Sequence, residues 1–253
     1  MNIEPIAAFR DNYIWAIREG ARAIVVDPGD AEPVLEWCRR NGVTIEGIWV
    51  THHHPDHVGG VARLQELFPE LSVAGPQGGR FEGIDQGLVD GDTIAAFGHR
   101  FQVLSVPGHT LDHIAYFCDT LTPPVLFCGD TLFAGGCGRV FEGTHEQMQQ
   151  SLDRLRSLPA NTLVYCAHEY TAANLRFAAA VEPDNAALQA RIQEVAAARA
   201  AGEPTVPTTV ERELATNPFL RWDQPAVVAA AAERGAGREP VEVFATIRLW
   251  KDQ

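Results

Sequence analysis

The chain has 253 residues, a formal net charge of −13 and an ordinary hydrophobic fraction of 46%, which indicate a globular protein of one large or two smaller domains. So acidic a surface repels nucleic acid, and without a long run of Lys or Arg we expect no nucleic-acid partner. No run reaches the roughly 18 to 20 apolar residues of a membrane span, residues 1–5 lack the features of a secretory signal, and five scattered cysteines favour a reducing cytoplasm.

The first two thirds of the chain alternate between strand-like and helix-like segments. The expected strands are short apolar runs, which cover residues 13–17, 23–26, 45–50, 101–106, 113–118, 125–128 and 162–166. A helix is expected after Asp30, with Pro33 in its first turn and Gly42 beyond its end. A second helix is expected after Thr144, which forms a capping box with Gln147.

The pattern changes after His168, where strand-like runs stop and alanine becomes frequent. Apolar residues at helical spacing predict helices over residues 186–201, 225–233 and 241–251. The second of these has Asp223 as its expected cap and Gly235 beyond its end. We therefore expect an α/β domain over residues 1–168, followed by a helical domain over residues 169–253.

The most informative segment runs from Thr51 to His57 and holds four histidines and an aspartate. Side chains two apart on an extended backbone point the same way, so His52, His54 and Asp56 are expected to converge. His57 lies where a helix is expected to begin. Imidazole and carboxylate are ligands that suit zinc, iron and manganese, and the number of donors predicts two metal ions.

Three later donors each follow a strand-like run and a small residue: His109, Asp130 and His168. Taken singly, each could be an ordinary loop or turn residue. Their repeated placement predicts that they meet at one edge of a sheet, where open α/β sheets place their sites. His53 and His113 are instead expected to be structural, since His53 points away from its neighbours and His113 lies in an apolar strand.

The pattern HxHxDH, followed by His, Asp and His, resembles that of the metallo-β-lactamase superfamily. Within it, the chain resembles the glyoxalase II (hydroxyacylglutathione hydrolase) family nearly from end to end. The resemblance is carried by residues 11–15, 51–60, 135–139, 141–144, 168–170, 217–219 and 248–252. It implies an α/β (α+β) fold, namely a metallo-β-lactamase-like αββα sandwich with a C-terminal helical domain that binds glutathione.

The same resemblance implies how the seven ligands are shared. They form two sets and a bridge: His52, His54 and His109 for one metal, Asp56, His57 and His168 for the other, and Asp130 between them. Two cations about 3.5 to 4 Å apart need such a shared anion to limit their repulsion. Zinc is the expected metal, with iron and manganese as alternatives.

The activity that the resemblance implies is hydrolysis of S-D-lactoylglutathione to D-lactate and glutathione, the second step of methylglyoxal detoxification. Asp56 and Asp130 would take part in catalysis, because cations held by such ligands make hydroxide available near neutral pH. The glutathione thiolate would leave without obligatory protonation, since a thiol pKa near 8.5 makes it a fair leaving group.

Glutathione carries carboxylates, so an acidic enzyme needs a local basic pocket. The resemblance assigns the substrate contacts to four residues: Arg139, Tyr170, Arg248 and Lys251. Arg248 and Lys251 are three apart and share a helix face. The animal enzymes have lysine where this chain has Arg139, and tyrosine where it has Phe141. The first change keeps the charge and the second removes a hydroxyl, so Phe141 is not counted among the polar contacts.

Other functions use the same motif: a lactonase, a β-lactamase, an iron persulfide dioxygenase, an RNA nuclease and a non-catalytic metal-binding module. A dioxygenase is expected to use one iron and to lack a full second set of ligands. A β-lactamase is expected to carry an export signal and to lack the helical tail, and a nuclease needs a basic surface. We therefore expect a cytoplasmic, monomeric thioester hydrolase with a small-molecule substrate.

Overall fold

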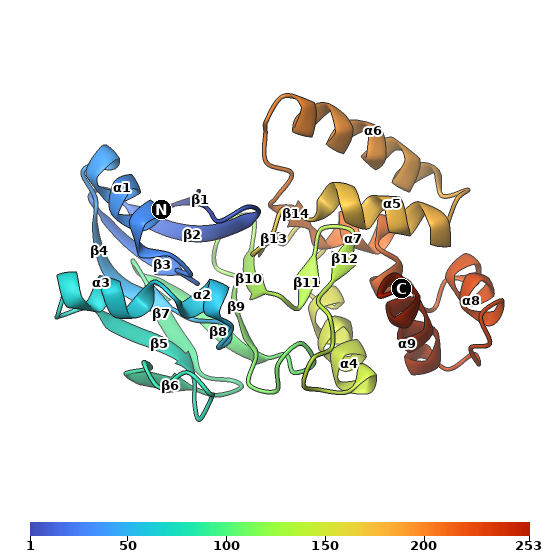
Figure 1. The fold of residues 1–253 in the computed structure, drawn as a ribbon, viewed down its shortest axis with the longest axis horizontal. Helices are drawn as coiled ribbons and strands as arrows, with labels where there is room; N and C mark the ends of the chain where they lie inside the picture. The colour runs from blue at the N-terminus through green and yellow to red at the C-terminus, as the bar shows by residue number, and fades with distance from the viewer. The chain divides into compact units, whose positions relative to one another are not determined.

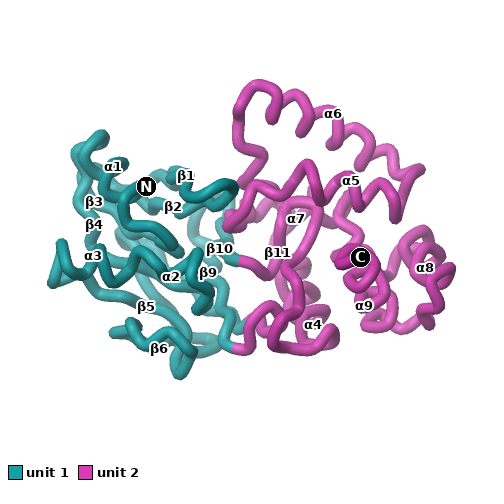
Figure 2. Tube along the Cα trace, viewed as in Figure 1, with its two compact units in different colours: residues 1–105, 112–129 teal, residues 106–111, 130–253 magenta.

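The computed structural model describes residues 1–253 and divides into two compact units (Figure 2). Unit 1 comprises residues 1–105 and 112–129, and unit 2 comprises residues 106–111 and 130–253. None of the helices combines the length and the apolar character that crossing a membrane requires.

Unit 1 contains a six-stranded sheet in the order β1-β2-β3-β4-β5-β6. Its strands are β1 Asn2–Ala8, β2 Asn12–Glu19, β3 Arg22–Val26, β4 Thr44–Trp49, β5 Ser72–Pro76 and β6 Gln86–Leu88. β2 pairs antiparallel with both β1 and β3, whereas β3 to β6 are parallel. Helices α1 Ala31–Asn41 and α3 Val61–Leu67 cover one face, where Val34 and Leu64 are fully buried with Ile48 of the sheet.

Four antiparallel strands form the second layer of sheet in unit 1, in the order β7-β8-β9-β10. They are β7 Thr93–Ala96, β8 His99–Ser105, β9 Ile114–Cys118 and β10 Val125–Gly129. The ring of Trp49 at the end of β4 lies 5.0 Å from those of Phe101 and Tyr116. The Tyr116 hydroxyl donates to the carbonyl of Val50 at 2.7 Å. Unit 1 is therefore built of helices, a mixed sheet and an antiparallel sheet in layers (Figure 1).

Unit 2 is mostly helical. Two short strand pairs belong to it: β11 Leu132–Phe133 with β12 Gly136–Cys137, and β13 Leu163–Cys166 with β14 Thr208–Thr209. Its helices are α4 His145–Arg156, α5 Thr171–Val181, α6 Ala186–Ala200, α7 Val210–Thr216, η1 Pro218–Leu220, α8 Pro225–Ala232 and α9 Pro240–Lys251. Figure 1 shows α6 beside α5 and α8 beside α9. Leu175 of α5 and Leu188 of α6 lie in one buried apolar cluster.

The local signals for helix ends are mostly confirmed. Asp30 caps α1 by accepting from the backbone N–H of Glu32, and Gly42 ends it with a φ of 63°. The capping box of Thr144 and Gln147 at the start of α4 is also present. The expected cap at Asp223 is wrong, because α8 follows Gln224 without a side-chain cap. The Asp223 carboxylate instead accepts from Arg156 at 3.1 Å.

The α/β class and the helical C-terminal region are confirmed. The expectation that strands stop at residue 168 is wrong, since β14 pairs with β13. Several elements were not foreseen: β1, β5, β6, β7, β11, β12, α5 and α7. Most of them are short or lack a capping residue, so neither a long periodic pattern nor a capping or turn residue marks them in the sequence.

Candidate metal centre and substrate pocket

The histidine segment follows β4 directly and is fastened to the turn after β3. The carboxylate of Asp27 accepts from the backbone N–H and from the hydroxyl of Thr51, both at 2.7 Å. The next residues lead into the short helix α2 Pro55–Val58, for which His54 is the N-cap residue. Gly29 permits this close approach, because a Cβ there would lie 1.8 Å from the backbone oxygen of Asp56.

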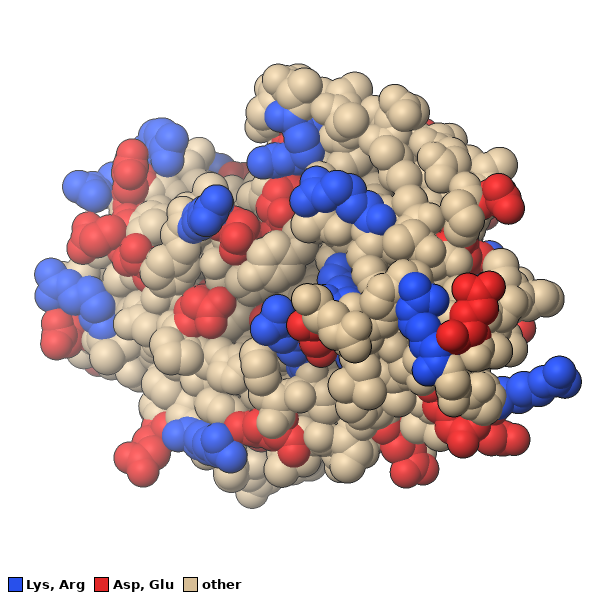
Figure 3. Space-filling model, turned by 45° about the vertical axis from the view of Figure 1, so that its right-hand side comes forward, with Lys and Arg blue, Asp and Glu red and all other residues tan.

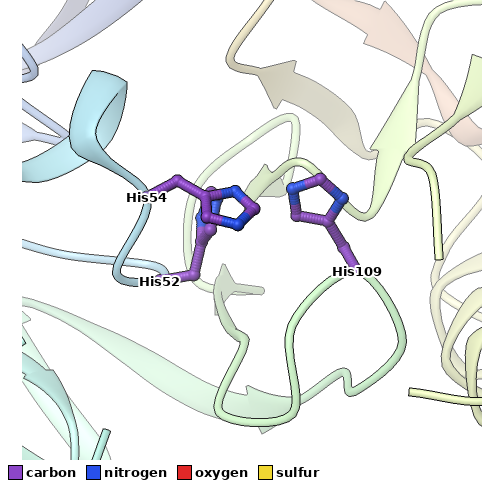
Figure 4. Close-up of side chains that lie close together, drawn as sticks. All are labelled: His52, His54 and His109. Carbon is purple, nitrogen blue, oxygen red and sulfur yellow. The ribbon is translucent and has the colours of Figure 1, made fainter. Parts of the chain in front are cut away.

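His52 and His54 turn their rings toward each other. The Nε2 atom of His52 lies 3.1 Å from Nδ1 of His54 (Figure 4). The expected convergence therefore holds for this pair. The reasoning from an extended backbone is wrong for Asp56, which lies within α2 rather than on a strand.

His57 is held between two carboxylates. It is 1% exposed; its Nδ1 lies 3.0 Å from Oδ2 of Asp27, and its Nε2 lies 3.6 Å from Oδ2 of Asp56. A carboxylate on Nδ1 fixes the tautomer and leaves Nε2 for a cation. Asn12 donates to Asp56 at 3.0 Å and so orients that carboxylate. Neither Asp27 nor Asn12 was predicted to have a role at the site, although Asp27 begins a polar turn and Asn12 lies in a segment that carries the family resemblance.

Two other histidines near this segment have structural partners. The Nδ1 atom of His53 lies 3.1 Å from the carboxylate of Asp112. His113 is fully buried, stacks on His52 at 4.5 Å and shares a hydrogen bond with the carbonyl of Ile114. Each of these histidines therefore has partners of its own in unit 1, a carboxylate for His53 and a ring and a carbonyl for His113.

The other three expected donors lie together in unit 2. The two oxygens of Asp130 face different imidazoles: Oδ2 lies 3.4 Å from Nε2 of His109, and Oδ1 lies 3.3 Å from Nε2 of His168. The Nδ1 atom of His109 donates to the carbonyl of Arg139 at 2.8 Å, which leaves its Nε2 for a cation. One carboxylate oxygen for each imidazole is the arrangement expected of a bridging ligand.

The separations between donors fit metal coordination. Metal–ligand bonds of about 2.0–2.2 Å place neighbouring ligand atoms of a tetrahedral site about 3.3–3.6 Å apart. The distances from Asp130 to His109 and His168, and from Asp56 to His57, all fall between 3.3 and 3.6 Å. Imidazole nitrogens and carboxylate oxygens are also the atoms that divalent ions select. The His and Asp clusters therefore suit divalent metal ions.

A pocket of about 450 Å³ lies in unit 2 beside these donors. Its lining includes two expected metal ligands, all four expected substrate contacts and five further residues: His109, Asp130, Arg139, Tyr170, Arg248, Lys251, Phe133, Cys137, Phe141, Ala173 and Asn174. The phenol ring of Tyr170 stacks on His168 at 4.6 Å. No motif in the sequence marks Asn174, Phe133 or Ala173 as pocket residues.

The cationic side of the pocket is partly buried and oriented by its neighbours. Arg248 is 1% exposed and donates to the carbonyl of Cys137 at 3.0 Å and to Asp252 at 2.9 Å. Lys251 donates to the side-chain oxygen of Asn174. Burial, and then the charge of Arg248, lower the pKa of Lys251 to about 8. Lys251 is therefore mainly cationic at pH 7 and loses its charge a little above that pH.

No cysteine in unit 2 has the properties of a nucleophile. Burial raises the pKa of the Cys137 thiol, although Arg248 beside it opposes the shift. Burial raises the pKa of Cys166 to about 12. Reactive cysteines need the opposite environment, in which the thiolate is favoured.

On the face drawn in Figure 3, Lys and Arg side chains occur in separate groups interspersed with Asp and Glu. A nucleic-acid site needs basic side chains joined in a patch or stripe. This face has no such stripe.

Comparison with known families covers the whole chain. The model of the metallo-β-lactamase superfamily matches residues 8–168, and that of the hydroxyacylglutathione hydrolase C-terminus matches residues 169–253. A hydroxyacylglutathione hydrolase of Chromohalobacter salexigens is 51% identical over 255 residues, which are 100% of this chain and 99% of that protein. One of Pseudomonas aeruginosa is also 51% identical, over 258 residues and the same shares of both chains.

Solved structures share the fold at lower identity. ETHE1 from Myxococcus xanthus superposes with a TM-score of 0.67 at 24% identity, over 99% of this chain and 98% of its own. The B3 metallo-β-lactamase BLEG-1 gives a TM-score of 0.63 at 22% identity, over 87% and 98%. These likenesses concern the fold alone, whereas the relatives at about half identity cover both the donor segments and the helical tail. The chain therefore belongs to the hydroxyacylglutathione hydrolase family of the metallo-β-lactamase superfamily.

Proposed function

We propose that this protein hydrolyses S-D-lactoylglutathione to D-lactate and glutathione, the second step of methylglyoxal detoxification. The observation that carries the proposal is the pocket of unit 2, where His109 and Asp130 share one cavity with Arg248 and Lys251. A thioester of glutathione needs both features, because its reacting carbonyl is neutral whereas its peptide ends in carboxylates. The names and full-length coverage of the relatives support the same substrate.

We propose two divalent ions as cofactors, zinc in the first place and iron or manganese as alternatives. The proposed ligands are His52, His54 and His109 for one ion, Asp56, His57 and His168 for the other, and Asp130 for both. Bound ions would supply Lewis acidity, which polarises a thioester carbonyl and lowers the pKa of a water molecule to roughly 7. The residues around the ligands support this use, since Asp27 and the Arg139 carbonyl each engage the Nδ1 atom of a ligand histidine.

The chain's own side chains would bind and orient the substrate. Arg248 is held by the carbonyl of Cys137 and by Asp252, so its guanidinium enters the pocket with little freedom. Lys251 and the more exposed Arg139 add two cations for the carboxylates of glutathione. Tyr170 is fixed by stacking on His168 and offers its hydroxyl beside that ligand. Restricted cations lose less entropy on binding than free ones, which favours affinity.

The reaction asks little acid–base work of the protein. A thiolate leaves without a proton donor, because its pKa is far below that of an alkoxide or amine. Phe141 lies 5.2 Å from the His109 ring and presents an apolar wall, so the pocket has no hydroxyl at that position. Asp56 and Asp130 would act in catalysis through the cations that they hold, and no cysteine or serine nucleophile is needed.

We also propose a cytoplasmic, monomeric protein with a catalytic domain over residues 1–168 and a glutathione-binding domain over residues 169–253. All five cysteines are reduced and buried, as suits a reducing compartment. The limits of the two matching family models support the division at residue 168.

The test combines metal analysis with an assay. Mass spectrometry of the native protein should find about two divalent ions per chain, as a bridged pair requires. The absorbance of S-D-lactoylglutathione should fall in the presence of the protein, and a chelator should abolish that loss until metal is returned. Full activity under chelation, or no hydrolysis of the thioester by metal-loaded protein, would reject the proposal.

A further inference from the structure

A buried polar cluster lies in unit 2 outside the pocket lining. Its members come from α6, β14 and α7 and are 3% exposed or less: Arg191, Thr208, Glu213 and Thr216. The guanidinium of Arg191 donates to Thr216 at 2.6 Å and to Oε1 of Glu213 at 2.5 Å. Thr208 donates to the same carboxylate oxygen at 2.7 Å. The Oε1 atom of Glu213 therefore accepts from Arg191 and Thr208 within this cluster.

The other oxygen of Glu213 faces the hairpin formed by β11 and β12. The backbone N–H of Gly135, in the turn of this hairpin, donates to Oε2 of Glu213 at 2.7 Å. The amide of Asn217 donates to the same oxygen at 2.9 Å. It also donates to the backbone carbonyls of Phe133 at 3.3 Å and Gly136 at 2.9 Å. Glu213 and Asn217 thus fasten the hairpin to α7 and its end, which Figure 1 shows beside β11 and β12.

The turn of the hairpin is packed closely against α5. Gly135 has a φ of +70°, which favours glycine, and a Cβ there would lie 2.7 Å from the side chain of Leu175. Asn174, the neighbour of Leu175 on α5, donates to the carbonyl of Ala134 at 3.1 Å. The N–H of Gly135 therefore points at Glu213 in a fixed orientation.

Three site residues, Tyr170, Arg248 and His109, contact this hairpin or the residues just after it. The ring of Phe133 lies edge-on to Tyr170 at 5.3 Å. The carbonyl of Cys137 accepts from Arg248, and the carbonyl of Arg139 accepts from His109. A displacement of the hairpin would therefore move the supports of two proposed substrate contacts and one proposed metal ligand together.

We propose that Glu213 is a positioning residue for the substrate pocket. It does not line the pocket; it fixes the hairpin, and the hairpin orients Arg248 through Cys137 and Tyr170 through Phe133. This inference rests on the proposed function, since it assigns those two side chains to a glutathione thioester. The simplest alternative is that the cluster only stabilises the helical region, as buried ion pairs commonly do.

The two edges of the carboxylate allow these possibilities to be separated. In Glu213→Gln, one carboxylate oxygen becomes an amide nitrogen. The buried guanidinium of Arg191 can only donate, so the remaining oxygen stays on its side and the amide nitrogen faces the N–H of Gly135. The hairpin thereby loses its hydrogen-bond acceptor. The matched control is Thr216→Val, which removes a bond to Arg191 and leaves the contact with Gly135 intact. Both variants disturb the buried cluster, but only the first releases the hairpin.

The experiment measures glutathione binding by calorimetry on the metal-loaded wild type, Glu213→Gln and Thr216→Val. We expect the dissociation constant to rise at least about fivefold in Glu213→Gln, and to stay within about twofold of wild type in Thr216→Val. Amide hydrogen exchange of residues 132–138 should quicken in the first variant alone. Should Glu213→Gln fail to fold, Asn217→Ala replaces it, because it removes the other fastening of the same hairpin.

Unchanged affinity and unchanged exchange in the hairpin variant would overturn the inference, as would an equal loss of affinity in Thr216→Val. If the metal-loaded wild type neither bound glutathione nor hydrolysed S-D-lactoylglutathione, the proposed function would fail. Hydrogen exchange would then still decide whether Glu213 holds the hairpin, so the two failures are distinguishable.

Discussion

The two units hold their parts of the site in contrasting ways. In unit 1, all donors come from one short segment, His52 to His57, which is supported by the turn at Asp27 and by Asn12. In unit 2, the donors and pocket residues are spread along the chain from His109 to Lys251, and backbone carbonyls and a hairpin orient them. Donors that are neighbours in the chain can be held by a few contacts to one turn, whereas donors that are far apart in the chain need contacts from several elements.

This difference predicts how each part responds to substitution. Substitution of Asp27 should act on metal binding, because its carboxylate contacts Thr51 and the proposed ligand His57. Substitutions in unit 2 should weaken metal binding where they alter a metal ligand, and substrate binding where they alter the cationic side of the pocket. The following substitutions examine that division in order of decreasing effect.

Asp130→Ala should have the largest effect, since it removes a carboxylate that faces two imidazoles at 3.3 and 3.4 Å. We expect loss of bound metal and a decrease in kcat/KM of at least about 10³-fold, several kcal/mol of transition-state stabilisation. Elemental analysis and the thioester assay on the same sample measure both. Asp184→Ala removes an equally charged but exposed side chain and should change neither. Retention of full metal content by Asp130→Ala would rule out its bridging role.

Asp27→Asn examines the anchor of unit 1. The substitution keeps an oxygen for the backbone N–H of Thr51 but removes the negative charge beside Nδ1 of His57. Loss of such a partner lowers metal affinity by about 10- to 100-fold. Competition with a chromogenic chelator measures the affinity. Excess metal should restore most activity, in contrast to Asp130→Ala; an unaltered metal affinity would show that Asp27 serves only the fold.

The double change Arg248→Ala and Lys251→Ala removes the cationic side of the pocket. We expect KM to rise about tenfold or more while kcat changes by less than about threefold, because these residues bind the part of the substrate that does not react. Steady-state kinetics with S-D-lactoylglutathione measure both constants. Arg234→Ala removes a cation that lies over the Trp250 ring of α9 and does not line the pocket, and it should leave KM unchanged. An unaltered KM in the double variant would reject the assigned pocket.

The pKa of Lys251, lowered to about 8 by burial, predicts a pH dependence of substrate binding. The cation that attracts carboxylate is present below pH 8 and is lost as the pH rises through that value, so KM should increase by about threefold between pH 7 and 9. Kinetics over this range test it. Lys251→Arg keeps its charge throughout and should flatten the profile. An equally steep rise in that variant would assign the titration to another group.

The contrast between the units also explains what could be read from the sequence. The strand, the turn and the donors of unit 1 are neighbours in the chain, so local pattern and ligand chemistry suffice to predict that His52 and His54 converge. Even there, the extended-backbone argument failed for Asp56, because Pro55 begins a helix instead of continuing a strand. Asp27 escaped notice since it belongs to a different strand end, which only the parallel pairing of β3 and β4 brings near.

In unit 2, the local sequence pattern predicted several helices but not the contacts that orient the pocket residues. The resemblance supplied Arg139, Tyr170, Arg248 and Lys251, and all four line one pocket. Nothing in the sequence marks Glu213 or Asn217 as fastenings of the hairpin, because their partners are backbone groups about 80 residues earlier in the chain. The domain division at residue 168 and the ligand sets that join residues of both units stay predictions.

Thr144→Ala should have the smallest effect. It tests whether a loss of helix stability in unit 2, without a change at the hairpin, alters substrate binding. Thr144 accepts from the backbone N–H of Gln147 at 3.1 Å, and Gln147 accepts in return from that of Thr144 at 2.9 Å. Loss of the cap should lower the free energy of unfolding by about 1 kcal/mol and the Tm by about 2–4 °C. Because the cap lies at one end of α4, the buried residues Met148, Leu152 and Leu155 still hold the helix in place, and no residue of α4 lines the pocket. KM and kcat should therefore stay within about 1.5-fold of wild type, a difference below about 0.3 kcal/mol. Calorimetry and kinetics on one preparation check both. If this variant weakened substrate binding as Glu213→Gln is expected to do, helical stability alone would govern the pocket, and the hairpin would have no separate role.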